Sequence, residues 1–287
     1  MIPKIVYVFW DGTMDTYTTA CLRNIQKMNP AFKVVVLSSE TTEDKPDNYD
    51  ALFVQAKSDW ARVDAVCKTG GVWIDISCIV LKPFEAWIDF DSDAFHGFEV
   101  PFDCDLVENW AFAAPKGCPV LLQWRWQFKK AIEDGFEKYN RNNEIPPCLE
   151  KWLPYLTNHQ ALHVAWKSVP NQEVRIVDST SKDMPYHLIS VCEWNNSRFV
   201  ELLRREKHLT SVFLKVNGQM KKELEWKGVR EMTAEEVSDI DRYSHVERLL
   251  KIRIGEGGQA RLTFLVVSIC VLIVILLVTR MTDGHPC

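Results

Sequence analysis

Residues 58–84 constrain the fold of this 287-residue chain more than any other segment, because they combine a helix pattern, a glycine pair and an acid-tipped strand pattern. The first part has a broad apolar face at helical spacing, and Asp59 lies in its first turn. Gly70 and Gly71 then end the helix, since paired glycines permit positive φ and a tight reversal. The apolar run that follows predicts a strand with Asp75 at its carboxyl end. In open α/β sheets, ligands bind at that edge.

Asp75 and Ser77 lie between two apolar, β-branched runs, where an unpaired carboxylate is costly. A hard divalent cation with phosphate oxygens would compensate for this charge. The alternative is that Asp75 caps a turn and pairs with Arg62. Asp59 and Arg62 are three residues apart on the predicted helix, so their side chains can point the same way.

The start of the chain predicts the first units of a parallel sheet. Lys4 to Trp10 reads as a strand, Thr16 to Met28 as a helix and Val34 to Leu37 as a second strand. This β-α-β order is typical of α/β folds. Further along, the pattern predicts a strand over Asn109 to Ala114 and one helix over Pro119 to Asn140.

Three blocks of sequence together carry a family resemblance. The first block, IPKIVYVFWDG, spans residues 2–12. The second is the S-D-x-x-R pattern of the predicted helix at residues 58–62, and the third is G-G-V-W-I-D at residues 70–75. These blocks resemble the capsular polysaccharide synthesis glycosyltransferases. Those enzymes are relatives of the DxD-motif sugar transferases, which include yeast-type α-mannosyltransferases and the large glucosylating toxins. The resemblance covers roughly residues 1–225, and its later blocks are weaker.

The resemblance implies a GT-A fold, a Rossmann-like α/β domain that binds a nucleoside diphosphate sugar with Mn²⁺ or Mg²⁺. The expected reaction is transfer of the sugar to a glycan or other hydroxyl acceptor, with retention of configuration. Trp10 would stack on the base, Asp59 and Arg62 would hold the sugar or ribose, and Asp75 would bind the metal. Lys215 follows an apolar run and could neutralise the leaving diphosphate.

The predicted site residues fall into three groups. Asn109 matches the loop near the transferred sugar in the related enzymes, and His208 and His159 are late-chain candidates for metal or diphosphate binding. The alternative for each histidine is an ordinary surface or core residue. The predicted set is Asp75 and Asn109 as catalytic residues, Trp10, Asp59, Arg62, Gly70, Gly71 and Lys215 as substrate-binding residues, and Asp75, Ser77 and His208 as metal ligands.

Ser77 stands where the DxD motif has its second aspartate, which leaves the metal one carboxylate short. A hydroxyl can bind a cation directly or through water, but such a site depends on the diphosphate for charge. The same feature favours an alternative, a catalytically weak, membrane-tethered nucleotide- or sugar-binding or scaffold protein with a GT-A shell. The literal DxD at residues 103–105 follows Pro101 and Phe102 instead of an apolar strand, so we expect a loop there.

Composition narrows the classes of partner and compartment. The net charge of −5 argues against a nucleic-acid partner, so any anion site must be local. The nine cysteines are scattered without a CxxC pair, which favours reduced thiols and a cytosolic catalytic domain.

The C-terminal part contains the second strong signal. Residues 262–279 form an 18-residue run without a charge, long enough to predict a transmembrane helix in place of a buried core helix. More basic residues precede the run than follow it, which places the main domain in the cytosol. With no signal-peptide pattern at the start, we expect a tail-anchored protein. The predicted organisation is a GT-A domain at 1–227, a charged helical linker at 228–260, the membrane helix at 261–280 and a short tail at 281–287.

Overall fold

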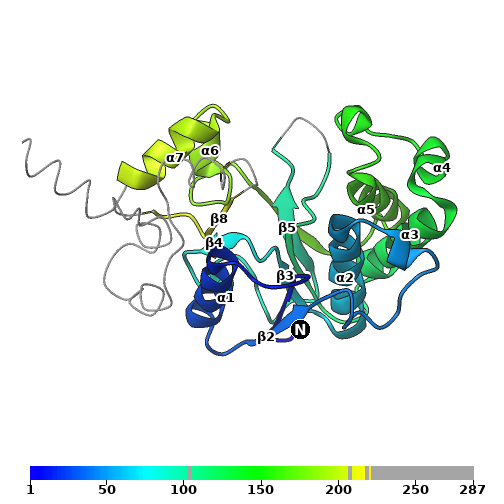
Figure 1. Ribbon diagram of the computed structural model, residues 1–287, viewed down its shortest axis with the longest axis horizontal. Coiled ribbons are helices and arrows are strands. Elements are labelled where there is room, and N and C mark those ends of the chain that lie inside the picture. Colours follow the sequence, from blue (N-terminus) through cyan, green and yellow to red (C-terminus); the bar gives the residue numbers. More distant parts are fainter. Residues whose placement is uncertain (102–104, 206–208, 217–219, 221–287) are drawn as a thin grey trace, which may run out of the picture.

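The computed structural model describes residues 1–101, 105–205, 209–216 and 220 (Figure 1). Its strands and helices follow each other in the order expected of an α/β protein. They are β1 (Ile5–Phe9), α1 (Thr16–Met28), β2 (Lys33–Leu37), α2 (Val54–Thr69), β3 (Gly71–Ile74), β4 (Cys78–Val80), β5 (Phe95–Glu99), β6 (Ala111–Ala114), α3 (Pro119–Asp134), α4 (Phe136–Arg141), α5 (Thr157–Ser168), β7 (Val174–Asp178), α6 (His187–Val191), α7 (Asn196–Arg205) and β8 (Phe213–Lys215).

A six-stranded sheet in the order β2-β1-β3-β6-β5-β7 forms the centre of the described part. Strand β1 pairs in parallel with β2 and β3, and β5 pairs in parallel with β7. Strand β6 is antiparallel to both of its neighbours, β3 and β5. The sheet is therefore mostly parallel, and the predicted α/β class is confirmed.

Alternate residues of the central strands face two separate apolar cores. Tyr7 and Trp73 belong to the core under α2, α3 and α5, whereas Val8 and Ile74 belong to the core on the other face. Figure 1 shows α2 to α5 on one side of the sheet, and α1, α6, α7 and the small sheet of β4 and β8 on the other. Because β3 is buried along its whole length, its carboxyl end is held in place by packing on both faces.

The predicted β-α-β opening is confirmed by β1, α1 and β2. The predicted helix over Pro119 to Asn140 is wrong in one respect, because the structure divides it into α3 and α4. The division falls at Gly135, which has a positive φ of 84°. Glycine adopts this conformation without the steric penalty that other residues pay, so the chain can turn there.

The predicted linker, membrane helix and tail lie outside the described residues. Among the helices that the structure does describe, none combines the length and apolar character needed to cross a membrane.

Gly70 and Gly71 connect α2 to β3 at a place where two other segments approach the backbone closely. Their φ values are +72° and +123°. A Cβ at Gly70 would lie 2.5 Å from the backbone nitrogen of Lys116, and one at Gly71 would lie 2.6 Å from the carbonyl oxygen of Ile5. The glycine pair thus serves the tight packing of this turn.

We expect Gly71→Ala to lower the free energy of unfolding by about 3 kcal/mol, because strain at positive φ adds to a backbone clash. Gly117→Ala is the matched control, since Gly117 has a φ of +77° but nothing within 4 Å of the added methyl group. It should cost about 1–2 kcal/mol. Denaturant unfolding measures both, and equal losses would contradict the clash.

Candidate functional site

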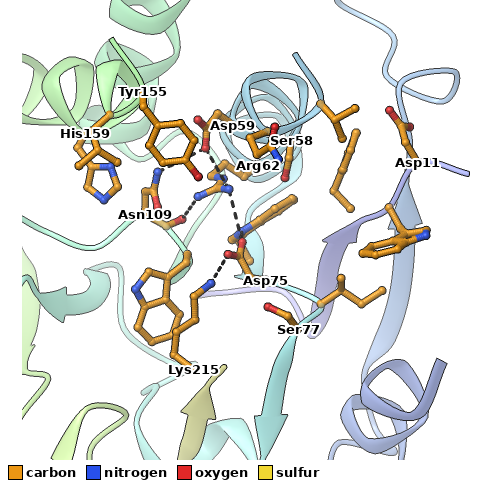
Figure 2. Close-up of a pocket in the computed structure, with 18 of the residues that line it drawn as sticks. Asp11, Ser58, Asp59, Arg62, Asp75, Ser77, Asn109, Tyr155, His159 and Lys215 are labelled. Carbon is orange, nitrogen blue, oxygen red and sulfur yellow. Dashed lines mark hydrogen bonds and ion pairs between the residues drawn. The ribbon is translucent and has the colours of Figure 1, made fainter. Parts of the chain in front are cut away.

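A pocket of about 590 Å³ opens where β1 and β3 end. The two strands are parallel, so their carboxyl ends meet at one edge of the sheet. Helix α2 leads back into β3, which places its first half beside that edge. The pocket is lined by residues at 9–11, 54–55, 58–59, 62, 73, 75–77, 109–110, 155–156, 159 and 215–216 (Figure 2).

Arg62 is the central charged group of the pocket, and it is 6% exposed. Its Nη2 lies 3.0 Å from Asp59 Oδ1 and 3.4 Å from Asp75 Oδ1. Its Nη1 donates a 2.9 Å hydrogen bond to the carbonyl oxygen of Asn109, and its guanidinium lies over the Trp73 ring. Arg62 therefore connects α2, the end of β3 and the segment before β6.

Asp75 is also paired with Lys215, which approaches from a distant part of the sequence. Asp75 Oδ2 accepts a hydrogen bond from Lys215 Nζ, and Oδ1 accepts one of 3.2 Å from Trp73 Nε1. The antiparallel pairing of β4 with β8 places Lys215 opposite Cys78, just beyond the Asp75 turn. The predicted role of Lys215 toward a diphosphate stays a prediction, but the fold brings its amine to the motif carboxylate.

The two carboxylates on Arg62 have opposite pKa shifts. Burial raises the pKa of Asp75, but the charges of Lys215 and Arg62 outweigh it and hold the pKa below its ordinary value of 3.8. Burial likewise raises the pKa of Asp59, and here Arg62 and weaker contacts do not reverse the shift. Asn109 Nδ2 lies 3.4 Å from Asp59 Oδ1. Lys215 has a raised pKa, because Asp75 outweighs the lowering effect of burial.

The two ends of the pocket differ in character. At one end, Asp11 accepts hydrogen bonds from the backbone nitrogen of Ser39 at 2.7 Å and from its hydroxyl, while Trp10 Nε1 donates to the Thr13 carbonyl at 3.2 Å. At the other end lie Tyr155 and His159, with the Asp75 cluster between (Figure 2).

His159 carries a further buried contact at this end of the pocket. Its Nε2 lies 3.6 Å from a carboxylate oxygen of Glu108, which is itself buried.

The structure brings most of the predicted site residues into this one pocket, and their individual roles stay predictions. Gly70 and Gly71 are the exception, since they lie at the start of β3, the opposite end from Asp75. The predicted substrate-binding role does not fit that position. His208 and residues 102–104, which carry most of the literal DxD, lie outside the described residues. The residues brought together are Trp10, Asp59, Arg62, Asp75, Ser77, Asn109 and Lys215.

Two of the residues that line the pocket, Asp11 and Tyr155, were not among the predicted site residues. Asp11 stood in the N-terminal block without an assigned role, although an acidic residue directly after a strand is a detectable signal. Tyr155 lies in a turn outside any periodic pattern, and no local signal marked it.

Sugar transferases with a DXD motif usually use a divalent metal, so the donor set can be tested for fit. Within the described residues, no group of three or more histidine, cysteine, aspartate or glutamate side chains could hold a metal. Asp75 and Ser77 offer one carboxylate and one hydroxyl at the same pocket wall. Hard cations that bind nucleotides are often held by one or two such ligands plus phosphate oxygens. The residues therefore fit a cation that binds together with a diphosphate.

Comparison with known proteins places this geometry in a class. Residues 3–93, which contain β1 and the Asp75 motif, match the family model described as "Glycosyltransferase sugar-binding region containing DXD motif". The match confirms the predicted resemblance and the enzyme class, a glycosyltransferase. A search of curated proteins gives no match.

Solved structures of glycosyltransferases show distant likenesses. A glycosyltransferase involved in glycosylation of the major capsid of PBCV-1 is 12% identical, with a TM-score of 0.44, and the match covers 76% of this chain and 96% of that one. GlyE of Streptococcus pneumoniae TIGR4 is 9% identical, with a TM-score of 0.46 and coverage of 89% and 61%. The galactosyltransferase LgtC, in complex with donor and acceptor sugar analogues, is 10% identical, with a TM-score of 0.43 and coverage of 89% and 99%.

We expect Asp75→Asn to lower the free energy of unfolding by about 3 kcal/mol at pH 7, because it leaves the partly buried Lys215 without its counter-charge and removes one partner of the buried Arg62. The folded-state pKa of Asp75 is lowered, so its contribution is present above the unfolded value of 3.8. As the pH falls below 3.8 and through the folded-state pKa, the contribution is lost. Urea unfolding of both proteins from pH 7 to pH 2.5 should therefore show a shrinking difference.

The matched control is Asp50→Asn, because the Asp50 side chain is 91% exposed. It should differ little from the wild type at any of these pH values. A difference for Asp75→Asn that stayed constant to the lowest pH would contradict the assigned ion pairing.

Proposed function

We propose that this protein is a metal-dependent glycosyltransferase that moves a sugar from a nucleoside diphosphate sugar to a glycan or other hydroxyl acceptor, with retention. The observation that carries the proposal is the cluster of Asp59, Asp75 and Lys215 around the buried Arg62. It lies at the carboxyl edge of the central strands, inside a pocket formed largely by the family-matched segment.

The lining residues favour one orientation of the nucleoside diphosphate sugar, with its base toward Trp10 and its sugar toward Asp59 and Arg62. Trp10 lies at the end next to the β1 loop, where an aromatic face can stack on a nucleotide base. Asp59 and Arg62 form a fixed pair of acceptor and donor groups for sugar hydroxyls, an orienting role that supports rate. Lys215 and Ser77 lie beside Asp75, where we expect the diphosphate (Figure 2).

In the proposed reaction, the bond between the sugar C1 and the β-phosphate oxygen breaks, and its electron pair leaves with the diphosphate. The acceptor hydroxyl oxygen forms the new bond to C1 and loses its proton. Lys215 would stabilise the charge that develops on the leaving group. A divalent cation held by Asp75 and Ser77 would supply further charge stabilisation when bound.

The carboxylates that line the pocket already have partners, and this supports retention of the anomeric configuration. Among the described lining residues, the carboxylates belong to Asp11, Asp59 and Asp75, and each is held by hydrogen bonds or an ion pair. In this proposal Asp75 holds the cation and Asp59 the sugar, while Asp11 is held by Ser39, so none of the three is assigned as a base for attack from the opposite face. A leaving diphosphate oxygen can take the acceptor's proton on its own face, and attack from that face retains configuration.

An aromatic surface at the other end of the pocket suits the acceptor. Tyr155 is 57% exposed and Phe53 is 43% exposed, and their rings stack with centroids 6.3 Å apart. Tyr155 and the neighbouring Val54 also line the pocket. Exposed aromatic faces beside a polar pocket can stack on sugar rings. We place the acceptor sugar against Tyr155.

A second function, nucleotide or sugar binding without efficient catalysis, is favoured by Ser77 at the position of the second motif aspartate. This binding function would use the same pocket as the glycosyltransferase but would turn over little substrate, so kinetic measurements distinguish the two functions. Membrane attachment through residues 261–280 is part of either proposal and rests on the sequence pattern.

The catalytic proposal predicts metal-dependent hydrolysis of one or more UDP- or GDP-sugars by the full chain. Asp75→Ala should lower the rate roughly a hundredfold or more, because it removes a cation ligand and unbalances the cluster. Asp89→Ala, which removes a surface carboxylate paired with Arg175, should leave the rate unchanged. If the wild type and Asp75→Ala were equally inert while a nucleotide still bound, the binding function would replace catalysis.

Tyr155→Ala should raise the acceptor KM about tenfold, the effect of one lost stacking contact, while the donor KM changes much less. Trp126→Ala removes an aromatic ring that is 54% exposed on α3 and outside the pocket, so it controls for general surface effects. An equal rise in both KM values for Tyr155→Ala would show that the acceptor does not rest on this ring.

A further inference from the structure

The charges around Arg62 balance one another before any ligand binds. Two carboxylates, Asp59 and Asp75, face two cations, Arg62 and Lys215. A nucleoside diphosphate brings at least two further negative charges into this pocket. Those charges need new compensation in a partly buried site, because both resident cations already have partners.

Both oxygens of Asp75 are engaged. Oδ1 lies 3.4 Å from Arg62 Nη2 in an ion pair and accepts a 3.2 Å hydrogen bond from Trp73 Nε1, while Oδ2 accepts a hydrogen bond from the Lys215 amine. A cation that approaches Oδ2 would lie beside the Lys215 ammonium, so like-charge repulsion opposes its binding unless the amine moves away.

The two cations around Asp75 differ in how firmly they are held. Arg62 also contacts Asp59 at 3.0 Å and donates to the Asn109 carbonyl at 2.9 Å. The Lys215 amine contacts Asp75 and lies over the Trp110 ring at 5.2 Å. Its backbone is fixed by the pairing of β8 with β4, but its four-carbon stem can rotate. Lys215 is thus the group that can leave Asp75.

We propose that Lys215 is the resident counter-ion of Asp75 and exchanges with the incoming cation, its amine passing to the diphosphate. This inference rests on the proposed function and extends it to the order of binding. A cation alone competes with Lys215 and binds weakly. A cation together with a diphosphate binds well, because the displaced amine gains a new anionic partner. By reciprocity, the nucleotide and the cation each raise the affinity of the other.

The test is Mn²⁺ binding to the full chain, followed by the electron paramagnetic resonance signal of free Mn²⁺, with and without UDP or GDP. The wild type should bind Mn²⁺ at least roughly tenfold more tightly when the nucleotide is present. Lys215→Met should bind Mn²⁺ alone at least roughly tenfold more tightly than the wild type, because the competing charge is gone. The gain in affinity on adding nucleotide should shrink in this variant.

Two variants control the experiment. Lys215→Arg keeps the competing charge and should not bind Mn²⁺ alone more tightly than the wild type. Lys82→Met removes a partly exposed lysine that lies outside the pocket and pairs with Asp183, so it should match the wild type. Lys215→Gln, which keeps a polar side chain, serves the same test if circular dichroism shows that Lys215→Met is not folded.

The outcomes separate this inference from the proposed function. If the wild type binds Mn²⁺ and nucleotide together but Lys215→Met binds Mn²⁺ alone no more tightly, the counter-ion role is overturned and the proposed function stands. If nucleotide binds equally well in EDTA, the exchange is overturned as well. If neither UDP nor GDP binds under any condition, the proposed function falls and the inference falls with it.

Discussion

The buried guanidinium of Arg62 is the group on which the rest of the pocket depends. A charge that is 6% exposed is tolerable only with partners, and Arg62 finds them on three different segments. Asp59 comes from the same helix, Asp75 from the end of β3, and the Asn109 carbonyl from the approach to β6. By satisfying one cation, these groups fix the position of the motif carboxylate at the sheet edge.

The opposite pKa shifts of Asp59 and Asp75 follow from this arrangement. Both carboxylates are partly buried and share Arg62, but Asp75 has Lys215 as a second cation. The site therefore favours the charged form of Asp75, the carboxylate nearest the expected diphosphate, and Ser77 lies beside it with a neutral oxygen. A motif with one carboxylate can work in such a setting, since the cation and the diphosphate arrive together and Lys215 supplies the remaining charge.

The spacing of apolar residues and glycines along the sequence predicted the elements that short segments determine by themselves. The β-α-β opening and the Asp75 strand were readable because their apolar periods and glycines lie within short windows. Gly135 was not recognised as a break, since a single glycine inside a helical pattern carries a weak signal. Gly70 and Gly71 are four to five residues from Asp75 in the sequence, yet the length of β3 separates them from Asp75 in space.

Tertiary contacts set the remainder of the site. Lys215 contacts Asp75 across 140 positions through the pairing of β4 with β8. The sequence indicated Lys215 as a candidate for the diphosphate, but no local pattern indicates its contact with Asp75. Tyr155 had no local signal.

The most direct test of the proposed binding mode is a crystal structure of the full chain with UDP or GDP and Mn²⁺. It should show the diphosphate between Lys215 and Ser77, with the base against Trp10. A diphosphate bound elsewhere, with the pair of Asp75 and Lys215 intact, would contradict the account.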